Sequence, residues 1–157
     1  MFQFIITSLS SIRPGEWKTL SEHYKKLLIP YAKFFSKELP AVKFNSLHDR
    51  VHVFEKEAVL IRKSFVPDAK TILLTEKGKL YTSEQFATAI DTWSEQHTRP
   101  LQFIIGGPLG FDPSLIKEVD ASVSLSPMTF PHDFAHILLL EQLYRAMTII
   151  HRKTYHY

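Results

Sequence analysis

The residues best suited to chemistry lie near the end of the chain, in Leu125-Ser-Pro-Met-Thr-Phe-Pro-His132. A strand over 121–125 is predicted to end there, and a long apolar helix begins at Asp133 and ends near His151. No earlier segment joins so irregular a backbone to so hydrophobic a neighbour. We therefore predict that the loop holds a small-molecule cofactor and that the helix behind it forms a partner surface.

Two histidines, His132 and His136, stand four residues apart at the start of that helix. This is the spacing of the zinc motif H-E-x-x-H, with Asp133 in the place of the glutamate. A catalytic zinc needs a third ligand, and the only carboxylate after Asp133 is Glu141, in the same helix. We therefore expect no metal, and we interpret Asp133 as an acid that the helix dipole favours in the first turn.

Other catalytic signatures are incomplete. Ile105-Gly-Gly-Pro-Leu-Gly110 lacks the first glycine of the dinucleotide fingerprint, and no acid follows about 20 residues later. Gly78-Lys79 precedes Leu80, where a Walker A motif has Ser or Thr. There is no G-x-S-x-G elbow, and Ser126 is equally suited to satisfying backbone groups. The chain has no cysteine, which excludes disulfides and thiolate chemistry.

Strand and helix patterns alternate five times along the chain. The strands are expected at 2–9, 39–44, 71–74, 101–105 and 121–125, and the helices at 17–28, 49–65, 83–93, 113–119 and 133–151. Asp49 and Ser83 are the expected caps, and 75–79 reads as a turn. The prediction is an α/β fold with a mostly parallel sheet and helices on both faces, as one domain over residues 1–157.

In an open parallel sheet, ligands bind beyond the carboxyl ends of the strands. Three such ends have unusual sequence: Leu74-Thr75-Glu76, Ile105-Gly106-Gly107 and Leu125-Ser126-Pro127-Met128. Adjacent glycines let backbone groups approach a ligand closely, although a tight turn explains two glycines equally well. These ends are the predicted edges of the site.

Composition and charge set wide limits. The chain of 157 residues has a formal charge of +3, which is compatible with a polyanionic partner without requiring one. The apolar N-terminus reads as a strand and not as a signal peptide, and no window approaches the roughly 20 apolar residues of a membrane span. A cysteine-free chain suits a reducing, cytoplasmic location.

The last helix is apolar in every direction, because Ile137-Leu-Leu-Leu140 covers its whole circumference. One face against a sheet cannot hide this run, so we predict a homodimer. The alternative is a central helix that other parts of the same protomer cover, which we favour less for the terminal helix of a small domain. The end of the chain combines cationic and aromatic groups that suit phosphate contact and base stacking: Arg145, Arg152, Lys153, Tyr155 and His156.

The sequence resembles the RlmH family of SPOUT-class RNA methyltransferases over most of its length. The resemblance is carried by Phe103-Ile-Ile-Gly-Gly-Pro-Leu-Gly110, Leu125-Ser-Pro-Met-Thr-Phe-Pro-His132, Leu139-Leu-Glu-Gln-Leu-Tyr-Arg-Ala146, Tyr155-His156 and Gly78-Lys-Leu-Tyr-Thr-Ser-Glu-Gln-Phe-Ala87. It implies a trefoil knot over approximately 101–157, a homodimer packed through the knot, and S-adenosylmethionine as cofactor. It also implies methylation of N3 of a pseudouridine in large-subunit (23S) ribosomal RNA, and we expect the assembled ribosome to be the substrate.

Residue roles follow from the same resemblance. The implied cofactor contacts are Leu74, Gly106, Leu125, Ser126, Pro127, Met128, Thr129 and Phe130. The leading candidate for assisting proton removal is His132, followed by Tyr155 and His156, and RNA contact is expected from His136, Arg145, Arg152 and Lys153.

The sequence departs from the family in two places. His136 replaces the usual arginine, and Leu109 stands where an acid is common. The first departure keeps open the alternative of a non-catalytic RNA- or ribosome-binding module that retains the fold.

Overall fold

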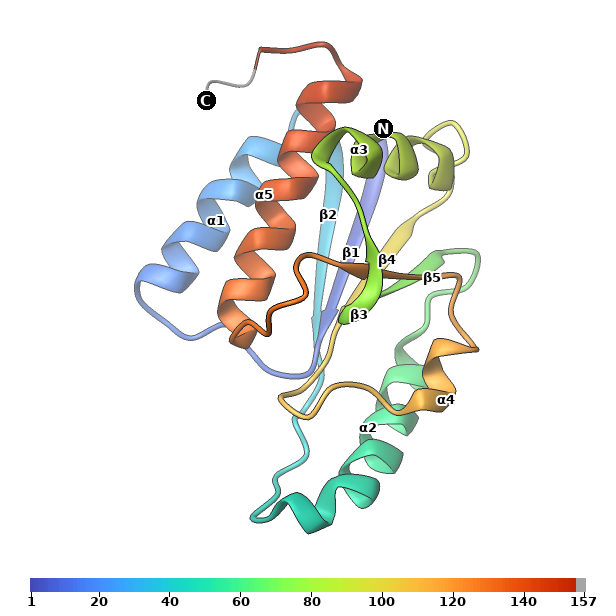
Figure 1. Cartoon of the computed structure of the whole chain (residues 1–157). Helices are drawn as coiled ribbons and strands as arrows, with labels where there is room; N and C mark the ends of the chain where they lie inside the picture. Colours follow the sequence, from blue (N-terminus) through green and yellow to red (C-terminus); the bar gives the residue numbers. More distant parts are fainter. Residues whose placement is uncertain (155–157) are drawn as a thin grey trace.

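The computed structural model describes residues 1–154 as a sheet covered by helices (Figure 1). The elements in chain order are β1 (Phe2–Ser8), α1 (Glu16–Leu28), β2 (Ala32–Glu38), the 3-10 helix η1 (Leu47–Asp49), α2 (Arg50–Ser64), β3 (Lys70–Leu80), α3 (Ser83–Trp93), β4 (Leu101–Ile105), α4 (Pro113–Ile116), β5 (Ala121–Ser124) and α5 (His132–Ile150). The predicted alternation of strands and helices is confirmed.

The sheet of the described residues has the strand order β2-β1-β4-β3-β5, and every pairing is parallel. Leu74 of β3 pairs with Ile105 of β4 on one side and with Val123 of β5 on the other. Residues of three strands that are separated in sequence therefore lie side by side, as the sequence predicted, although β3 continues beyond this point to Leu80.

Alternate side chains of the central strands belong to two separate hydrophobic clusters, because neighbouring strand residues point to opposite faces of the sheet. Ile72 and Phe103 pack with α1, α3 and α5, whereas Leu73 and Ile104 pack with α2 and α4. Helices thus cover both faces, which confirms the α/β fold class. The trefoil knot stays a prediction.

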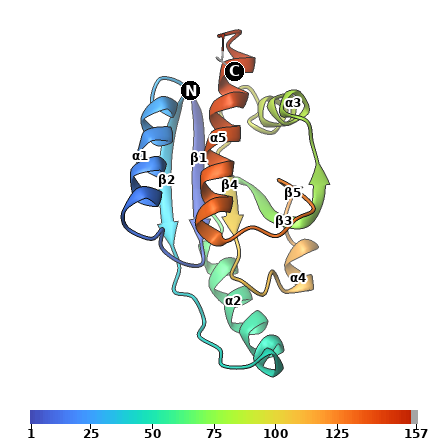
Figure 2. The same cartoon turned by 60° about the vertical axis from the view of Figure 1, so that its left-hand side comes forward.

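The last helix is buried within its own protomer, contrary to the expectation from its apolar run. α5 lies between α1 and α3 over the sheet (Figure 2). Leu139, Leu140, Leu143 and Met147 are each 0% exposed. Its hydrophobicity therefore needs no second copy, and the homodimer prediction rests on the family resemblance alone.

Several local expectations were wrong. The second strand is 32–38, and residues 39–46 form an extended segment outside the sheet. Residues 75–78 belong to an irregularity within β3, where the pairing register with β5 shifts, and do not end the strand. The α3 cap is Thr82, which forms a capping box with Gln85, and Asp49 precedes α2 without a side-chain cap bond. Caps one residue apart are not separable from sequence when both are hydroxyls.

Candidate active site

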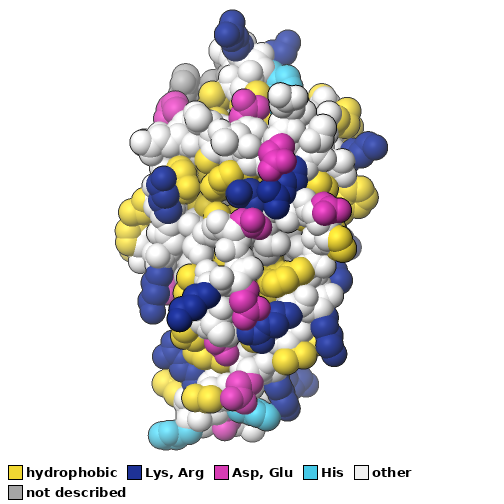
Figure 3. Space-filling view, turned by 90° about the vertical axis from the view of Figure 1, so that its right-hand side faces the viewer, with side chains coloured by type: hydrophobic (Ala, Val, Ile, Leu, Met, Phe, Trp, Pro, Cys, Tyr) yellow, Lys and Arg dark blue, Asp and Glu magenta, His cyan; other side chains and the backbone are white. Residues whose placement is uncertain are grey.

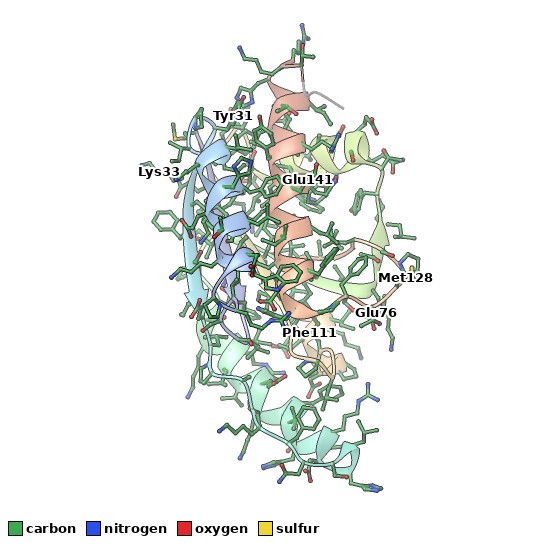
Figure 4. All side chains as sticks on the ribbon, turned by 90° about the vertical axis from the view of Figure 1, so that its left-hand side faces the viewer. Tyr31, Lys33, Glu76, Phe111, Met128 and Glu141 are labelled. Carbon is green, nitrogen blue, oxygen red and sulfur yellow. The ribbon has the colours of Figure 1, made fainter. Side chains whose placement is uncertain are left out.

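A cavity of about 940 Å³ opens where β3, β4 and β5 meet the start of α5. Figure 4 shows Glu76, Phe111 and Met128, three of its lining residues, near the level of the N-terminal end of α5. The predicted cofactor contacts that line it are Leu74, Gly106, Leu125, Ser126, Met128, Thr129 and Phe130, and Pro127 is the one that does not. A volume of this size suits a ligand the size of a nucleoside derivative.

The loop after β5 is held by its own serines. Ser124 Oγ donates to the carbonyl of Ser126 over 2.9 Å, and the Met128 N–H donates to Ser126 Oγ over 3.0 Å. Ser126 therefore satisfies backbone groups, which is one of the two roles that its sequence position allowed. Met128, which lines the cavity, is 73% exposed.

Side chains pack closely against the two adjacent glycines. A Cβ at Gly106 would lie 2.9 Å from the Phe111 ring, and one at Gly107 would lie 3.0 Å from Glu57 Oε1. The Gly110 N–H donates to the carbonyl of Gly107 over 3.1 Å, and Gly110 has a φ of 85°. The segment is thus a tight turn that also exposes bare backbone to the cavity.

His132 lines the cavity with both ring nitrogens buried and without a hydrogen bond of normal geometry to the described residues. Burial lowers the pKa of His132, and the carboxylates of Asp133 and Glu38 and the backbone of Gly106 and Ser10 oppose this only in part. At neutral pH the imidazole is therefore neutral, and a neutral imidazole has a free lone pair that can accept a proton.

Asp133 anchors the loop before α1 to the start of α5. The Arg13 N–H donates to Oδ1 over 3.0 Å, and the Arg13 guanidinium donates to Oδ2. Burial alone would raise the pKa of Asp133, but these hydrogen bonds and the Arg13 charge hold the pKa below its ordinary value. Among residues 1–154, no group of three or more His, Cys, Asp or Glu side chains could hold a metal ion.

The structure removes His136 from the set expected to contact RNA. Its side chain is buried, with the residue 3% exposed, and Nε2 lies 3.5 Å from Ser21 Oγ of α1. Burial and the nearby charges of Lys25 and His132 lower the pKa of His136 to about 4. A neutral side chain packed between two helices cannot reach a phosphate, so the predicted contact of His136 with RNA is wrong for this protomer.

The cationic residues predicted near the site do not gather there within one protomer. Arg145 forms an ion pair with Glu141, with 2.6 Å between Nη2 and Oε1. Arg152 and Lys153 follow the far end of α5, whose 19 residues put them roughly 28 Å from His132. Tyr155 and His156, the other predicted catalytic residues, lie outside the described residues.

Sequence reasoning missed one wall of the cavity. It is lined by Ala41, Val42, Lys43 and Phe44, which were predicted to be a strand, and by Asn45. The alternating apolar residues of this segment face the cavity and not a sheet, because no strand pairs with the segment. Pro40 was the one sequence signal against a regular strand.

Glu57 of α2 was also missed. It is 3% exposed, and its carboxylate packs against Gly107 and accepts a hydrogen bond from the Val42 backbone. Burial raises the pKa of Glu57. A carboxylate four residues after Val53 and four before Ile61, on the buried face of a helix, is the signal that could have found it. Glu57 thereby links two segments that line the cavity.

Comparison with known proteins agrees with this architecture. A family model described as a predicted SPOUT methyltransferase matches residues 2–156. The chain is 39% identical over 136 residues to the ribosomal RNA large subunit methyltransferase H of Parabacteroides distasonis, covering 85% of each chain. It is 35% identical over 147 residues to the protein of that name from Phocaeicola vulgatus, covering 89% of this chain and 94% of that one.

A structural likeness was also found. The crystal structure of the SpoU methyltransferase AviRb from Streptomyces viridochromogenes, in complex with the cofactor AdoMet, is 13% identical with a TM-score of 0.45. The match covers 92% of this chain and 57% of that one.

Proposed function

We propose, from the premise that this chain belongs to the SPOUT methyltransferase family, that it methylates large-subunit ribosomal RNA with S-adenosylmethionine as the methyl donor. The acceptor in this proposal is N3 of a pseudouridine, as the resemblance to the RlmH family implies. The observation that carries the proposal is the cavity itself, because all but one of the motif residues expected to hold the cofactor line it.

The residues present fit this cofactor. The bare backbone of Gly106 and Gly107 can approach an adenosine closely, and the apolar side chains of Leu74, Leu125 and Phe130 can cover its base. When bound, the cofactor supplies an electrophilic methyl group on a sulfonium. The chain's task is then to hold the acceptor nitrogen in line with that methyl, so that catalysis is chiefly positioning.

We propose His132 as the acceptor of the proton that leaves N3 of the pseudouridine. The N3–H proton of the pseudouridine passes to a ring nitrogen of His132, and the lone pair so released on N3 forms the new bond to the methyl carbon. The bond between that carbon and sulfur breaks, and its electron pair stays on the sulfur, which would leave as a neutral thioether. A neutral imidazole that lines the cavity, and whose pKa is lowered by burial, is suited to this role. We propose Tyr155 and His156 as further catalytic residues.

We further propose a single catalytic domain over residues 1–157, with a knotted, cofactor-binding part over approximately 101–157, that acts as a homodimer in the cytoplasm on the assembled ribosome. Arg152 and Lys153 lie too far from His132 in one protomer to serve its site. In a dimer, the cationic end of one copy can contribute to the cavity of the other, and Arg145 adds charge along the same helix.

The alternative of a non-catalytic RNA-binding module was motivated by His136. That residue is buried and does not line the cavity, so its departure from the family arginine gives the alternative little support. The two functions differ in one direct measurement, which is calorimetric titration with S-adenosylmethionine. Binding is expected, and its absence from folded protein would favour the module.

The reaction is tested by mass mapping of large-subunit ribosomal RNA from cells with and without the gene. We expect one methyl group to be lost from a pseudouridine and to return when the gene is restored. An unchanged methylation pattern would refute the proposed acceptor.

A further inference from the structure

Two cationic side chains stand at the rim of the cavity on the side of α2, and the proposed chemistry does not use them. Lys43 is exposed and lines the cavity from the segment 39–46. Arg50 begins α2, and its Nη2 lies 3.5 Å from the carbonyl of Leu109 in the glycine turn. The two residues therefore flank one side of the opening.

Both side chains are carried on supported backbone. On either side of Lys43, Val42 and Phe44 are half-buried and line the cavity, and the Val42 backbone is hydrogen-bonded to the buried Glu57. The Arg50 guanidinium lies 5.0 Å from the centroid of the Phe54 ring, a cation–π distance. These contacts hold the two cations at the rim and limit how far they can swing away.

Neither cation has a carboxylate partner among residues 1–154, in contrast to the other well-placed arginines. Arg13 pairs with Asp133, Arg62 with Glu118 and Arg99 with Glu95. The cavity is also lined by one carboxylate, Glu76 of β3. Figure 4 shows Glu76 close to Met128 of the loop after β5. The rim is thus cationic on one side and anionic on the other.

The surface around α2 carries further cations. In Figure 3, Lys and Arg side chains are spread over the lower part of the molecule, where α2 lies, among hydrophobic and acidic side chains, and His side chains lie at its lower end. His48, His52 and Lys56 are among the exposed residues there. Unpaired cations beside a nucleotide-sized cavity match the chemistry of a phosphodiester backbone, which presents regularly spaced negative charges.

We propose that Lys43 and Arg50 bind the phosphates that flank the target nucleotide, so that the RNA strand crosses the α2 side of the cavity. This inference rests on the proposed function and adds to it the direction from which the RNA approaches. It also places RNA contact on residues other than the helix end at Arg152 and Lys153. Lys43 and Arg50 position the substrate and take no part in the methyl transfer.

The test is the double variant Lys43→Ala/Arg50→Ala, with Lys26→Ala/Lys33→Ala as a control that removes two exposed cations from α1 and β2. Binding is measured at several salt concentrations, both with ribosomal RNA extracted from cells lacking the protein and with ribosomes from those cells. We expect the test variant to raise the KM for RNA about tenfold or more and to lower the slope of log K against log salt by about 1.5, since each phosphate contact contributes roughly 0.7–0.9. The control should change neither quantity.

A general loss of structure is excluded by two further measurements on the double variant. Its affinity for S-adenosylmethionine and its Tm should match those of the wild type, because neither side chain is buried. A KM and a salt slope that stay at wild-type values would overturn the inference. So would a loss of affinity for ribosomes that leaves binding to the extracted RNA unchanged, since the contact would then be with an acidic protein surface.

The inference and the proposed function fail in different ways. If the wild-type protein transfers no methyl to RNA or ribosomes, the proposed function fails and the inference falls with it. If the wild type is active and the double variant is equally active at limiting RNA, only the inference fails.

Discussion

At the scale of single residues, His132 combines three properties that a proton acceptor needs. It lies in the cavity, its ring nitrogens have no hydrogen-bonded partner among residues 1–154, and burial keeps its pKa below the ordinary value of 6.5. The imidazole is then neutral at the pH of the cell, because burial outweighs the attraction that the carboxylates of Asp133 and Glu38 exert on its protonated form.

We predict that His132→Ala lowers the single-turnover rate of methyl transfer by about 100-fold, at the lower end of what general-base catalysis contributes. Because the neutral form is the active one, the wild-type rate should fall as pH falls through the lowered pKa of His132 and should be flat above pH 7. The measurement is a pH–rate profile with saturating cofactor. A folded His132→Ala protein with wild-type rate would show that His132 is not the acceptor.

His136 makes the stability of the protein depend on pH. Its pKa is about 4 in the folded state, against 6.5 for a free histidine, so the unfolded chain binds the proton more tightly. The stability that its neutral form provides is complete above pH 6.5 and is lost as pH falls from 6.5 to about 4. A shift of this size corresponds to about 3 kcal/mol of unfolding free energy.

We therefore predict that His136→Leu makes the unfolding free energy less dependent on pH across this window. Urea denaturation of both proteins between pH 7 and pH 4.5 measures the difference. The raised pKa of Glu57 acts in the opposite direction, but Glu57 is present in both proteins and cancels. Parallel stability curves for the two proteins would show that His136 does not titrate as its burial indicates.

At the scale of elements, the pairing of β3 with β5 depends on Gly78. A Cβ at this position would lie 2.5 Å from the carbonyl carbon of Val123 and 2.7 Å from its nitrogen. Both are backbone atoms of the neighbouring strand, so they cannot rotate away as a side chain can. The irregularity that places Leu74 and Lys79 against the same Val123 therefore requires glycine between them.

We predict that Gly78→Ala destabilises the protein by about 3 kcal/mol, in the upper range of overpacking costs. The exposed neighbour Lys77 is the control, and Lys77→Ala should change stability by less than about 0.5 kcal/mol. Chemical denaturation measures both. Equal stabilities of the two variants would mean that β3 and β5 can separate at this point without cost.

At the scale of the whole molecule, an aromatic pair on the exposed side of α5 and α1 is a candidate contact for a second protomer. α5 is already buried by α1, α3 and the sheet, yet Phe134 of α5 is 45% exposed and packs against Trp17 of α1, with 5.6 Å between ring centroids. A half-exposed aromatic pair close to the cavity is compatible with a second protomer, although the burial of α5 no longer requires one.

We predict a dimer by analytical ultracentrifugation at micromolar concentration. Phe134→Ala should shift the equilibrium toward monomer, whereas Met128→Ala, which removes an exposed apolar side chain from the cavity loop, should leave it unchanged. A wild-type protein that sediments as a monomer would refute the dimer and, with it, the sharing of Arg152 and Lys153 between protomers.

Much of the fold and part of the site follow from the sequence alone, because their signals are local. The alternation of strands and helices is set by hydrophobic period and turn residues, and the parallel sheet then brings Leu74, Gly106 and Leu125 to one edge. The cavity-lining loop 125–130 was identified from its own irregular composition. His132 was placed at the cavity because it directly follows that loop.

The tertiary structure alone decided the features that depend on residues distant in sequence. Residues 41–45 form a wall of the cavity because no strand pairs with them, and Glu57 lies against Gly107 although 50 positions separate them. The run Ile137–Leu140 is covered by α1 and α3, which periodicity cannot reveal, since it describes which directions are apolar and not what fills them. Burial is a property of the packed chain, and for that reason it also removed His136 from the RNA surface and made its imidazole neutral.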